Sequence, residues 1–508
     1  MKAFTEPLLS LAGFEEMTKT AEKSSGLISV TGCIDAQKSQ MIYAFGGHRK
    51  NKLIVTFGEQ KAKELYDEYS FFDKEVVYYP SKDVLFYQSD IRGNLLTAER
   101  IRALKAIREQ ERVTLVTTFD ALMNTMAPIE KMWENVLTLE QGQLLDLKEI
   151  QAALIRMGYE KEYQVQTMGQ FSVRGGILDV FPLTEENPIR IELWGDEIDT
   201  IRYFDCESQK SIENTDRVSI YPAAELVLSD EEKAGGIEKL KAEAKRVSDK
   251  LRKQMKTEEA HRVTVMADEL TEEWGELSMY AGMDAFLSYF FDERVGLLDY
   301  FNPSDSLIFF DELTRCTEQG KLTETEFSES MKQRLAMGYI LPGQMNGLFT
   351  EKEIVAKLGK YSCIALAALD NKANGLHQLG SYGIHCQSVS PYNNSFELLI
   401  KDLKRYKKNG YRVILLSGSR TRAKRLSEDI TDQGITCFYT ENYDHELSQG
   451  QIMVCYGKVR RGFEYPILKF AVITESDIFG AQQKKKKRHR TYEGEKIQSF
   501  TDLSVGDY

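Results

Sequence analysis

Short apolar segments alternate with helical segments along the first 135 residues, and this alternation limits the folds that the chain can adopt. The apolar segments are residues 27–30, 53–56, 76–79 and 113–117, and the helical segments between them include 59–69 and 99–110. Buried strands that are separated by helices are typical of a parallel sheet covered by helices on both faces. We therefore predict an α/β fold for this part of the chain.

The predicted sheet is interrupted by a segment of different character. Residues 136–222 mostly follow the period-2 alternation of strands and are predicted to form a small α+β insert. Helical character returns after the insert, where Gly235-Gly236 precede a long charged helix predicted from 237 to about 256. We predict that residues 1–135 and 223–385 are two halves of one sheet domain, built around the insert.

The remainder of the chain is predicted to contain a second, smaller domain and two terminal segments. Residues 386–478 repeat the strand and helix pattern and are predicted to form a small α/β domain. Residues 479–500 contain a run of lysines and arginines that is typical of a solvated linker. Residues 501–508 open a strand and a turn and then stop, so we expect a truncated chain.

An alternating run at residues 189–194 of the insert predicts a strand with two different faces. If Ile191 and Leu193 face the core, then Arg190 and Trp194 share the outward face. Arginine beside an outward tryptophan is the composition of a protein-binding hot spot. An ordinary half-buried strand with solvated arginines explains the pattern equally well, so the alternation alone leaves both interpretations open.

The segment after the first predicted strand contains part of a phosphate-binding loop. A Walker A loop has the pattern G-x-x-x-x-G-K-[ST]. Gly32 fills its first position, and Lys38 and Ser39 fill its last two. Gln37 stands where a glycine normally lets backbone N–H groups fold around the phosphates, so we expect a distorted loop.

A second nucleotide-site motif follows the apolar strand at 307–310. Asp311 and Glu312 end this strand as the acids of a Walker B motif do, where they hold Mg²⁺ and orient water. Such a pair also arises by chance, but two motifs after separate strands favour a decayed ATPase site. We predict a RecA-like, helicase-type sheet domain whose nucleotide site is degenerate and non-functional. The residues of this site are Gly32, Gln37, Lys38, Ser39, Asp311 and Glu312.

Composition excludes several classes of protein. The net charge of −12 over 508 residues argues against a protein that coats DNA, which would be basic. The seven cysteines and six histidines form no CxxC or HExxH motif, so we expect no metal site and no disulfide framework, and a cytoplasmic location. No long apolar run and no secretory signal is found in the sequence, so we expect no membrane partner.

Residues 170–211 resemble one family closely. The order Phe-Ser-Val-Arg-Gly-Gly-Ile-Leu-Asp-Val-Phe-Pro, followed by the arginine and tryptophan strand, is similar to domain 2 of the UvrB and Mfd proteins of bacterial nucleotide excision repair. Residues 300–312 are similar to the approach to the Walker B strand in UvrB, and residues 473–508 resemble Mfd, the transcription-repair coupling factors. The broken phosphate loop, and the little room before Tyr300 for the long aromatic hairpin of UvrB, favour the Mfd family.

The resemblance implies a function and its residues. In the family, domain 2 docks UvrA, and the matching positions are Arg174, Arg190 and Trp194; the family often has phenylalanine at the last. The resemblance also implies that the chain is the N-terminal half of such a protein and is not itself catalytic. RNA polymerase, DNA, ATP and Mg²⁺ are then expected to bind through the missing half, which begins with the polymerase-interacting domain at 501–508. We expect Arg190→Ala to weaken UvrA binding sharply while the melting temperature stays nearly unchanged.

Two other functions stay open. A UvrB-like ATP-dependent helicase that recognises DNA damage would require a competent phosphate loop, against which Gln37 argues. A plain nucleic-acid-binding protein would require a basic surface, against which the acidic balance argues. The sequence predicts neither the oligomeric state nor a role for residues 386–478.

Overall fold

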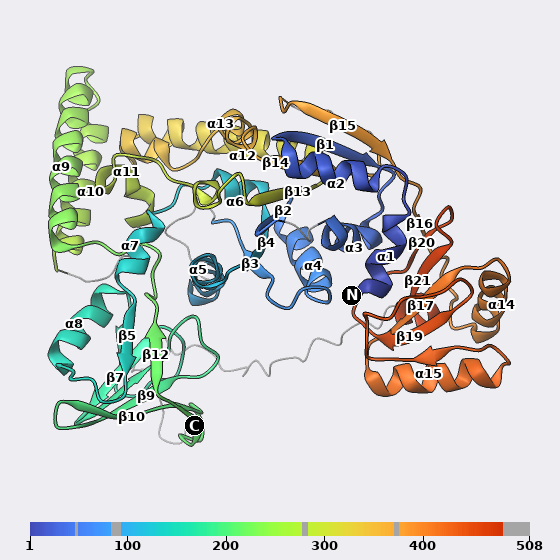
Figure 1. Cartoon of the computed structure of the whole chain (residues 1–508). Helices are drawn as coiled ribbons and strands as arrows, with labels where there is room; N and C mark the ends of the chain where they lie inside the picture. The colour runs from blue at the N-terminus through green and yellow to red at the C-terminus, as the bar shows by residue number, and fades with distance from the viewer. Residues whose placement is uncertain (46–48, 83–92, 277–282, 370–374, 481–508) are drawn as a thin grey trace, which may run out of the picture.

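A computed structural model of the chain describes residues 1–45, 49–82, 93–276, 283–369 and 375–480. Its largest sheet has seven strands in the order β15-β1-β14-β13-β2-β4-β3, and all the pairings between them are parallel (Figure 1). Strands from before and after the insert form this one sheet, which confirms the predicted interrupted α/β fold. The strands are β1 (Gly26–Thr31), β2 (Asn51–Thr56), β3 (Val77–Tyr79), β4 (Val113–Thr118), β13 (Ser306–Asp311), β14 (Ser362–Leu366) and β15 (Gln378–Gly383).

Both faces of this sheet are buried, which explains why its strands are continuously apolar. In β13, Phe309 belongs to the hydrophobic core on one face, and Ile308 and Phe310 belong to the core on the other. The helices of this domain are α1 (Lys2–Leu9), α2 (Phe14–Lys23), α3 (Asp35–Phe45), α4 (Glu59–Tyr69), α5 (Gly93–Glu109), α6 (Phe119–Met123), α7 (Ile129–Glu134), α12 (Leu313–Ala336) and α13 (Glu351–Leu358), with 3₁₀ turns at Leu297–Tyr300 and Pro342–Asn346.

The insert forms a separate sheet of six strands in the order β11-β10-β9-β8-β7-β6, beside a two-stranded ribbon of β5 and β12. One face of the six-stranded insert sheet is buried around Phe171, Leu178 and Ile191, against Leu154 of α8. The elements are β5 (Leu137–Glu140), α8 (Leu147–Arg156), β6 (Glu160–Lys161), β7 (Gln170–Arg174), β8 (Ile177–Val180), β9 (Ile189–Trp194), β10 (Glu197–Phe204), β11 (Ser211–Thr215) and β12 (Arg217–Ile220).

The Gly175-Gly176 pair forms the turn of a hairpin. Arg174 pairs with Ile177, so the two glycines are the whole connection between β7 and β8. Gly175 has a φ of 61°, which favours glycine. A Cβ on Gly176 would lie 3.1 Å from the carbonyl oxygen of Leu193, so this position also brings two backbones close together.

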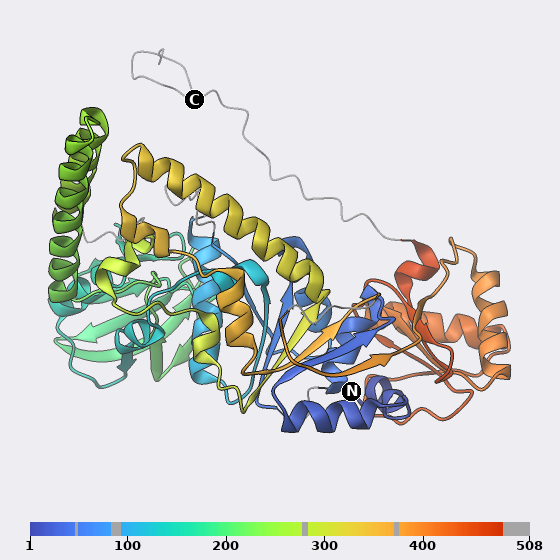
Figure 2. The same cartoon turned by 90° about the horizontal axis from the view of Figure 1, so that it is seen from above.

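A hairpin of two long helices, α9 (Asp230–Lys253) and α10 (Thr257–Glu276), follows the insert and stands at one end of the molecule (Figure 2). The sequence-based start at residue 237 is wrong, because Ser229 caps the helix and Gly235-Gly236 lie inside it. A Cβ on Gly236 would lie 2.2 Å from the ring of Phe290. These glycines therefore permit close packing and do not mark the beginning of the helix.

The aromatic segment after this hairpin is buried. It forms a 3₁₀ turn at Met283–Phe286 and the short helix α11 (Leu287–Phe290). The rings of Phe286 and Phe290 lie 5.0 and 5.8 Å from that of Trp274. These aromatic side chains form the hydrophobic core of the helical hairpin and are not available as an exposed clamp.

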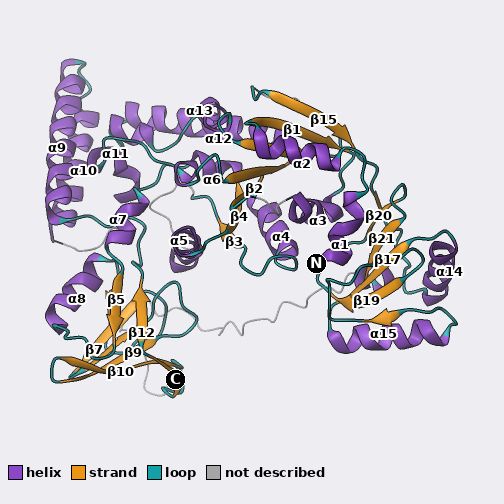
Figure 3. Cartoon of the chain, in the orientation of Figure 1, coloured by secondary structure: helices purple, strands orange, loops and turns teal. Residues whose placement is uncertain are grey.

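The small α/β domain lies at the opposite end of the seven-stranded sheet from the insert (Figure 1 and Figure 3). Its six strands run in the order β16-β20-β21-β17-β19-β18, and α14 and α15 share the core on one face. The other face packs against Phe4 and Leu8 of α1, in a hydrophobic core that it shares with the seven-stranded sheet. The elements are β16 (Gln387–Ser388), α14 (Phe396–Lys408), β17 (Arg412–Ser417), α15 (Arg420–Asp432), β18 (Phe438–Tyr439), β19 (Ile452–Tyr456), β20 (Phe463–Tyr465), β21 (Phe470–Thr474) and α16 (Glu475–Phe479).

Two of the predicted segments cannot be placed. From residue 481 onward, the linker predicted at 479–500 and the segment 501–508 lie outside the described residues. Within the described part of the chain, no helix combines the length and the apolar composition needed to cross a lipid bilayer.

Candidate functional site

The outer face of the insert sheet gathers charged side chains from three adjacent strands. Ile189 and Ile191 of β9 are buried on the core side, and Arg190, Glu192 and Trp194 alternate with them. The strand register places Arg190 directly opposite Asp179 of β8. The alternation predicted from the sequence is therefore the one that the strand adopts.

Asp179 is the centre of the charge cluster on this face. Arg190 donates from Nε to Asp179 Oδ1 at 2.7 Å and from Nη2 to Oδ2 at 2.8 Å. Arg174 Nη2 donates to the same Oδ2 at 2.9 Å. Arg190 also donates to Gln209 Oε1 at 2.8 Å, and its guanidinium lies 4.3 Å from the centre of the Phe204 ring. Two cations therefore share one carboxylate.

Exposure decides what this cluster can offer to a partner. The Asp179 side chain is 2% exposed, that of Arg190 is 13% exposed and that of Arg174 is 36% exposed. The hydrogen bonds to Asp179 raise the pKa of Arg190. Removing Arg190 would leave a buried carboxylate with one partner, so the expectation that Arg190→Ala leaves the melting temperature nearly unchanged does not fit the structure.

Trp194 lies apart from the two arginines. It ends β9 four residues after Arg190, a separation of about 13 Å along a strand. Glu192, which pairs with Arg202, lies between them on the same face. The Trp194 side chain is 85% exposed. The three predicted residues share a face, but the structure brings only Arg174 and Arg190 into contact with a common group.

The loop after β1 packs closely against the segments of the same chain that follow β14 and β15. Gly32 has a φ of 76°, and a Cβ there would lie 2.0 Å from the carbonyl oxygen of Ile384. The N–H groups of Gly32 and Cys33 donate to the carbonyl oxygens of Ala368 and Ala367 at 3.3 and 2.9 Å. Backbone groups that would cradle a phosphate in a Walker A loop are thus bonded to protein.

Helix α3 begins early and includes the position of the missing glycine. It starts at Asp35, so Gln37, Lys38 and Ser39 are helical and buried. The side-chain amide of Gln37 and the hydroxyl of Ser39 have no hydrogen-bond partner among the described residues. The distortion expected at Gln37 takes this form: the helix replaces the end of the loop.

Lys38 bridges the two nucleotide-site motifs. Its Nζ donates to Asp311 Oδ1 at 2.5 Å, Glu312 Oε1 at 2.9 Å and Asp35 Oδ1 at 3.2 Å. Its side chain is 1% exposed. Burial alone would lower the pKa of Lys38, but the charges of Asp311 and Glu312 outweigh burial and raise it. The lysine therefore neutralises the acids that would hold a magnesium ion in a working site.

Glu312 is held in an uncommon backbone conformation beside this lysine. Its φ of 60° and ψ of 67° are left-handed, which a residue with a side chain rarely adopts. Besides accepting from Lys38, its Oε1 accepts from the N–H of Ala368 at 3.1 Å. Within the described residues, no group of three or more His, Cys, Asp or Glu side chains is arranged to hold a metal.

The chain is similar in sequence to known proteins. Residues 137–226 match the family described as the UvrB interaction domain. Transcription-repair-coupling factors from Bacillus subtilis (strain 168), Staphylococcus haemolyticus (strain JCSC1435) and Staphylococcus aureus (strain MRSA252) are 28%, 28% and 27% identical over 458, 493 and 510 residues. The chain is a homologue of the transcription-repair-coupling factors.

The similarity covers most of the chain but a smaller share of its relatives. The three alignments include 90%, 95% and 97% of this chain, and 38%, 41% and 42% of the transcription-repair-coupling factors. The chain therefore spans about two-fifths of the length of these relatives. The match to the UvrB interaction domain falls on the insert and its return to the sheet domain.

Asp179 is the residue of this site that the sequence-based interpretation missed. It stands between Leu178 and Val180, both buried, so the alternation places it on the outer face. The sequence does contain a signal for this residue: an acid at an outward-facing position, in the strand that forms a hairpin with the strand of Arg174. Its pairing with Arg190 depends on the register between β8 and β9, which the sequence does not reveal.

Proposed function

We propose that the chain is the repair-recruitment part of a transcription-repair-coupling factor. In this proposal the insert docks UvrA, and the seven-stranded sheet domain carries the insert without binding ATP or Mg²⁺ and without catalysis. One observation carries it: Arg174, Arg190 and Trp194 share the outer face of a sheet that matches the UvrB interaction domain. An exposed tryptophan on the same sheet face as partly exposed arginines has the composition of a protein-binding hot spot.

The other activities of the relatives belong to parts that this chain does not span. We propose that RNA polymerase and DNA are bound through those parts, in the cytoplasm, and that ATP drives translocation there. The insert would then connect a stalled polymerase to UvrA. The acidic net charge and the closed phosphate loop support this assignment of DNA and ATP binding to other parts.

Titration of purified UvrA against the chain tests the docking function. Trp194→Ala is the first variant, because Trp194 is 85% exposed and its removal is expected to leave the fold intact. Loss of a hot-spot aromatic should weaken binding about 30-fold. Tyr163→Ala is the matched control: Tyr163 is 83% exposed and lies just after β6, an edge strand of the insert sheet that is three strands away from β9. The control should bind as the parent chain does.

Arg174→Ala provides a second variant with a small structural cost, because Arg190 continues to pair with Asp179. Its affinity for UvrA should also fall. If the parent chain does not bind UvrA, or if Trp194→Ala, Arg174→Ala and Tyr163→Ala all bind equally well, this face is not the docking site.

A UvrB-like helicase is the competing function, and nucleotide binding separates the two. Lys38 is engaged by Asp311 and Glu312, and the loop amides are bonded to Ala367 and Ala368. We expect no heat of binding when ATP and Mg²⁺ are titrated into the chain, and no ATP turnover with or without damaged DNA. Saturable ATP binding would reject the recruitment-only assignment and favour the helicase.

A further inference from the structure

The end of β9 presents apolar side chains on both sides of a carboxylate. Trp194 pairs with Glu197 across the turn to β10, and Glu197 also bridges to Leu144 on its other side. Residues that face each other in antiparallel strands lie on the same face of the sheet. The Trp194 side chain is 85% exposed and that of Leu144 is 75% exposed. Glu197 therefore lies between two large apolar side chains that no part of the described chain covers.

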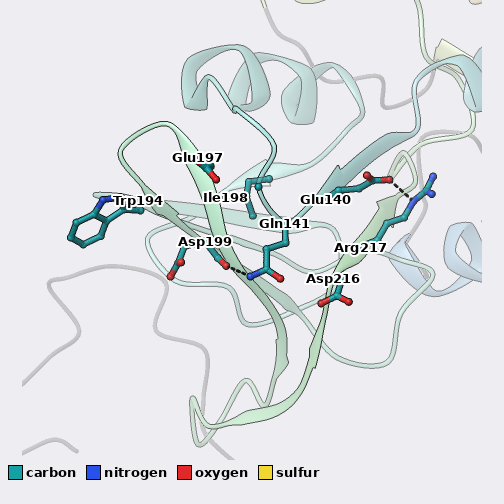
Figure 4. Close-up of a pocket in the computed structure, with 9 residues that line it drawn as sticks. Glu140, Gln141, Trp194, Glu197, Ile198, Asp199, Asp216 and Arg217 are labelled. Carbon is teal, nitrogen blue, oxygen red and sulfur yellow. Dashed lines mark hydrogen bonds and ion pairs between the residues drawn. The ribbon is translucent and has the colours of Figure 1, made fainter.

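A shallow cleft of about 750 Å³ begins at this point and runs toward the β5–β12 ribbon. Figure 4 shows Trp194 at one end of its lining and Arg217 at the other. Arg217 pairs with Glu140 at 3.2 Å, and Gln141 Nε2 donates to the backbone oxygen of Asp199 at 2.7 Å. These contacts hold the far wall of the cleft in place.

The remaining charges of the cleft are negative and unpaired. Glu197, Asp199 and Asp216 are exposed, and none of their carboxylates forms an ion pair within the part of the chain that the structure describes. The outer-face arginines differ, because Arg174 and Arg190 are already paired with Asp179. The charge that this end of the insert still offers to a partner is therefore anionic.

We propose that the cleft beside Trp194 receives a lysine- or arginine-bearing segment of the docking partner. This inference rests on the proposed function, because it names the chemistry with which UvrA would meet the insert. The aliphatic part of such a side chain would pack on Trp194 and Leu144, and its charge would lie over the indole or among the three carboxylates. The arginines paired with Asp179 would shape the adjoining face without supplying the main charge contact.

Removing the three charges without changing side-chain shape tests the inference. The variant Glu197→Gln/Asp199→Asn/Asp216→Asn should bind UvrA at least about tenfold more weakly. Its affinity should also depend less on salt concentration, because fewer charge pairs form. The matched control is Glu160→Gln/Glu162→Gln/Glu186→Gln, which changes the net charge equally. These three glutamates are exposed: Glu160 and Glu162 lie in or just after the edge strand β6, and Glu186 precedes β9 at the end opposite Trp194, so the control should bind normally.

Carbodiimide coupling gives an independent measurement, because it joins a lysine amine directly to a carboxylate in contact with it. Mass spectrometry of the coupled complex should find a UvrA lysine joined to Glu197, Asp199 or Asp216. Coupling only to the control glutamates would overturn the inference.

The outcomes separate this inference from the docking function. If the cleft variant and the control bind UvrA equally while Trp194→Ala does not, the insert docks UvrA but the cleft receives no cationic segment. If the parent chain fails to bind UvrA, the docking function itself is wrong. The inference is supported if the cleft variant, but not the control, binds UvrA more weakly and with less dependence on salt concentration.

Discussion

Two buried aspartates in this molecule are neutralised by basic side chains, and the surroundings of each pair differ. Asp311, at the end of β13, is paired with Lys38, whose side chain is 1% exposed. Asp179, in β8, is paired with Arg190 and Arg174, whose side chains are 13% and 36% exposed. The first cluster is closed to ligands, whereas the second lies at a surface. The same chemistry therefore serves packing in the sheet domain and, in the proposed function, a docking surface in the insert.

The largest expected effect tests the closed cluster. Lys38→Met leaves Asp311 and Glu312 without their cation, and an uncompensated buried charge costs about 3–5 kcal/mol of folding free energy. Urea denaturation measures the loss. The double variant Lys38→Met/Asp311→Leu removes the stranded charge as well and should recover most of the stability. A Lys38→Met variant as stable as the parent chain would show that the cluster is open to water.

A third buried carboxylate shows what happens without a paired cation. Burial of Glu68 in α4 raises the pKa of its carboxyl from 4.5 to about 7. Because the folded-state pKa lies above the unfolded one, folding stability should fall as the pH rises from about 4.5 through 7. Glu68→Gln should stabilise the chain at pH 8 by on the order of 2 kcal/mol and flatten this dependence. Thermal denaturation of both proteins between pH 5 and pH 8 is the measurement; parallel profiles would contradict it.

The open cluster should show a smaller loss. Arg190→Ala leaves Asp179 paired only with Arg174, so we expect a loss of about 2 kcal/mol. Arg174→Ala should cost less than about 1 kcal/mol, because Arg174 makes one bond to the cluster and is more exposed. Denaturation of the two variants side by side ranks the contacts. Equal losses would mean that the two arginines hold Asp179 equally.

The smallest expected effect on stability belongs to the residue with the largest expected effect on binding. Trp194→Ala should change the free energy of unfolding by less than about 0.5 kcal/mol, because its side chain is 85% exposed. The comparison between the two aspartate clusters then extends to a residue that contributes little to folding stability. A destabilised Trp194→Ala variant would mean that the indole packs on the chain in solution.

The regular parts of the fold could be predicted from local sequence because their signals are local. The apolar runs of β1, β2, β4 and β13 are contiguous, and α4 begins and ends at the predicted residues 59 and 69. The helix start near Gly235-Gly236 was wrong because glycine there serves contact with Phe290, which is distant in sequence. A long-range packing constraint leaves no local pattern.

The candidate site was only partly predictable for the same reason. The outward alternation of Arg190 and Trp194 follows from a period of two, which local sequence contains. The shared partner Asp179 depends on strand register, and the closure of the phosphate loop depends on Ile384, Ala367 and Ala368, which follow Gly32 by hundreds of residues. The helical position of Gln37 likewise reflects packing of α3 that a motif comparison does not include.

The strand order of the large sheet has a consequence for synthesis of the chain on the ribosome. β1 and β2 are consecutive in sequence, yet β14 and β13 separate them in the sheet. A nascent chain that has emerged only as far as residue 222 can pair β2 with β4 and β4 with β3, while β1 has no neighbour until β14 and β15 arrive. The insert, whose strands are all local, can fold first. Translation thus yields a folded insert attached to an incomplete sheet, whose open strand edges need protection from aggregation until the remaining strands arrive.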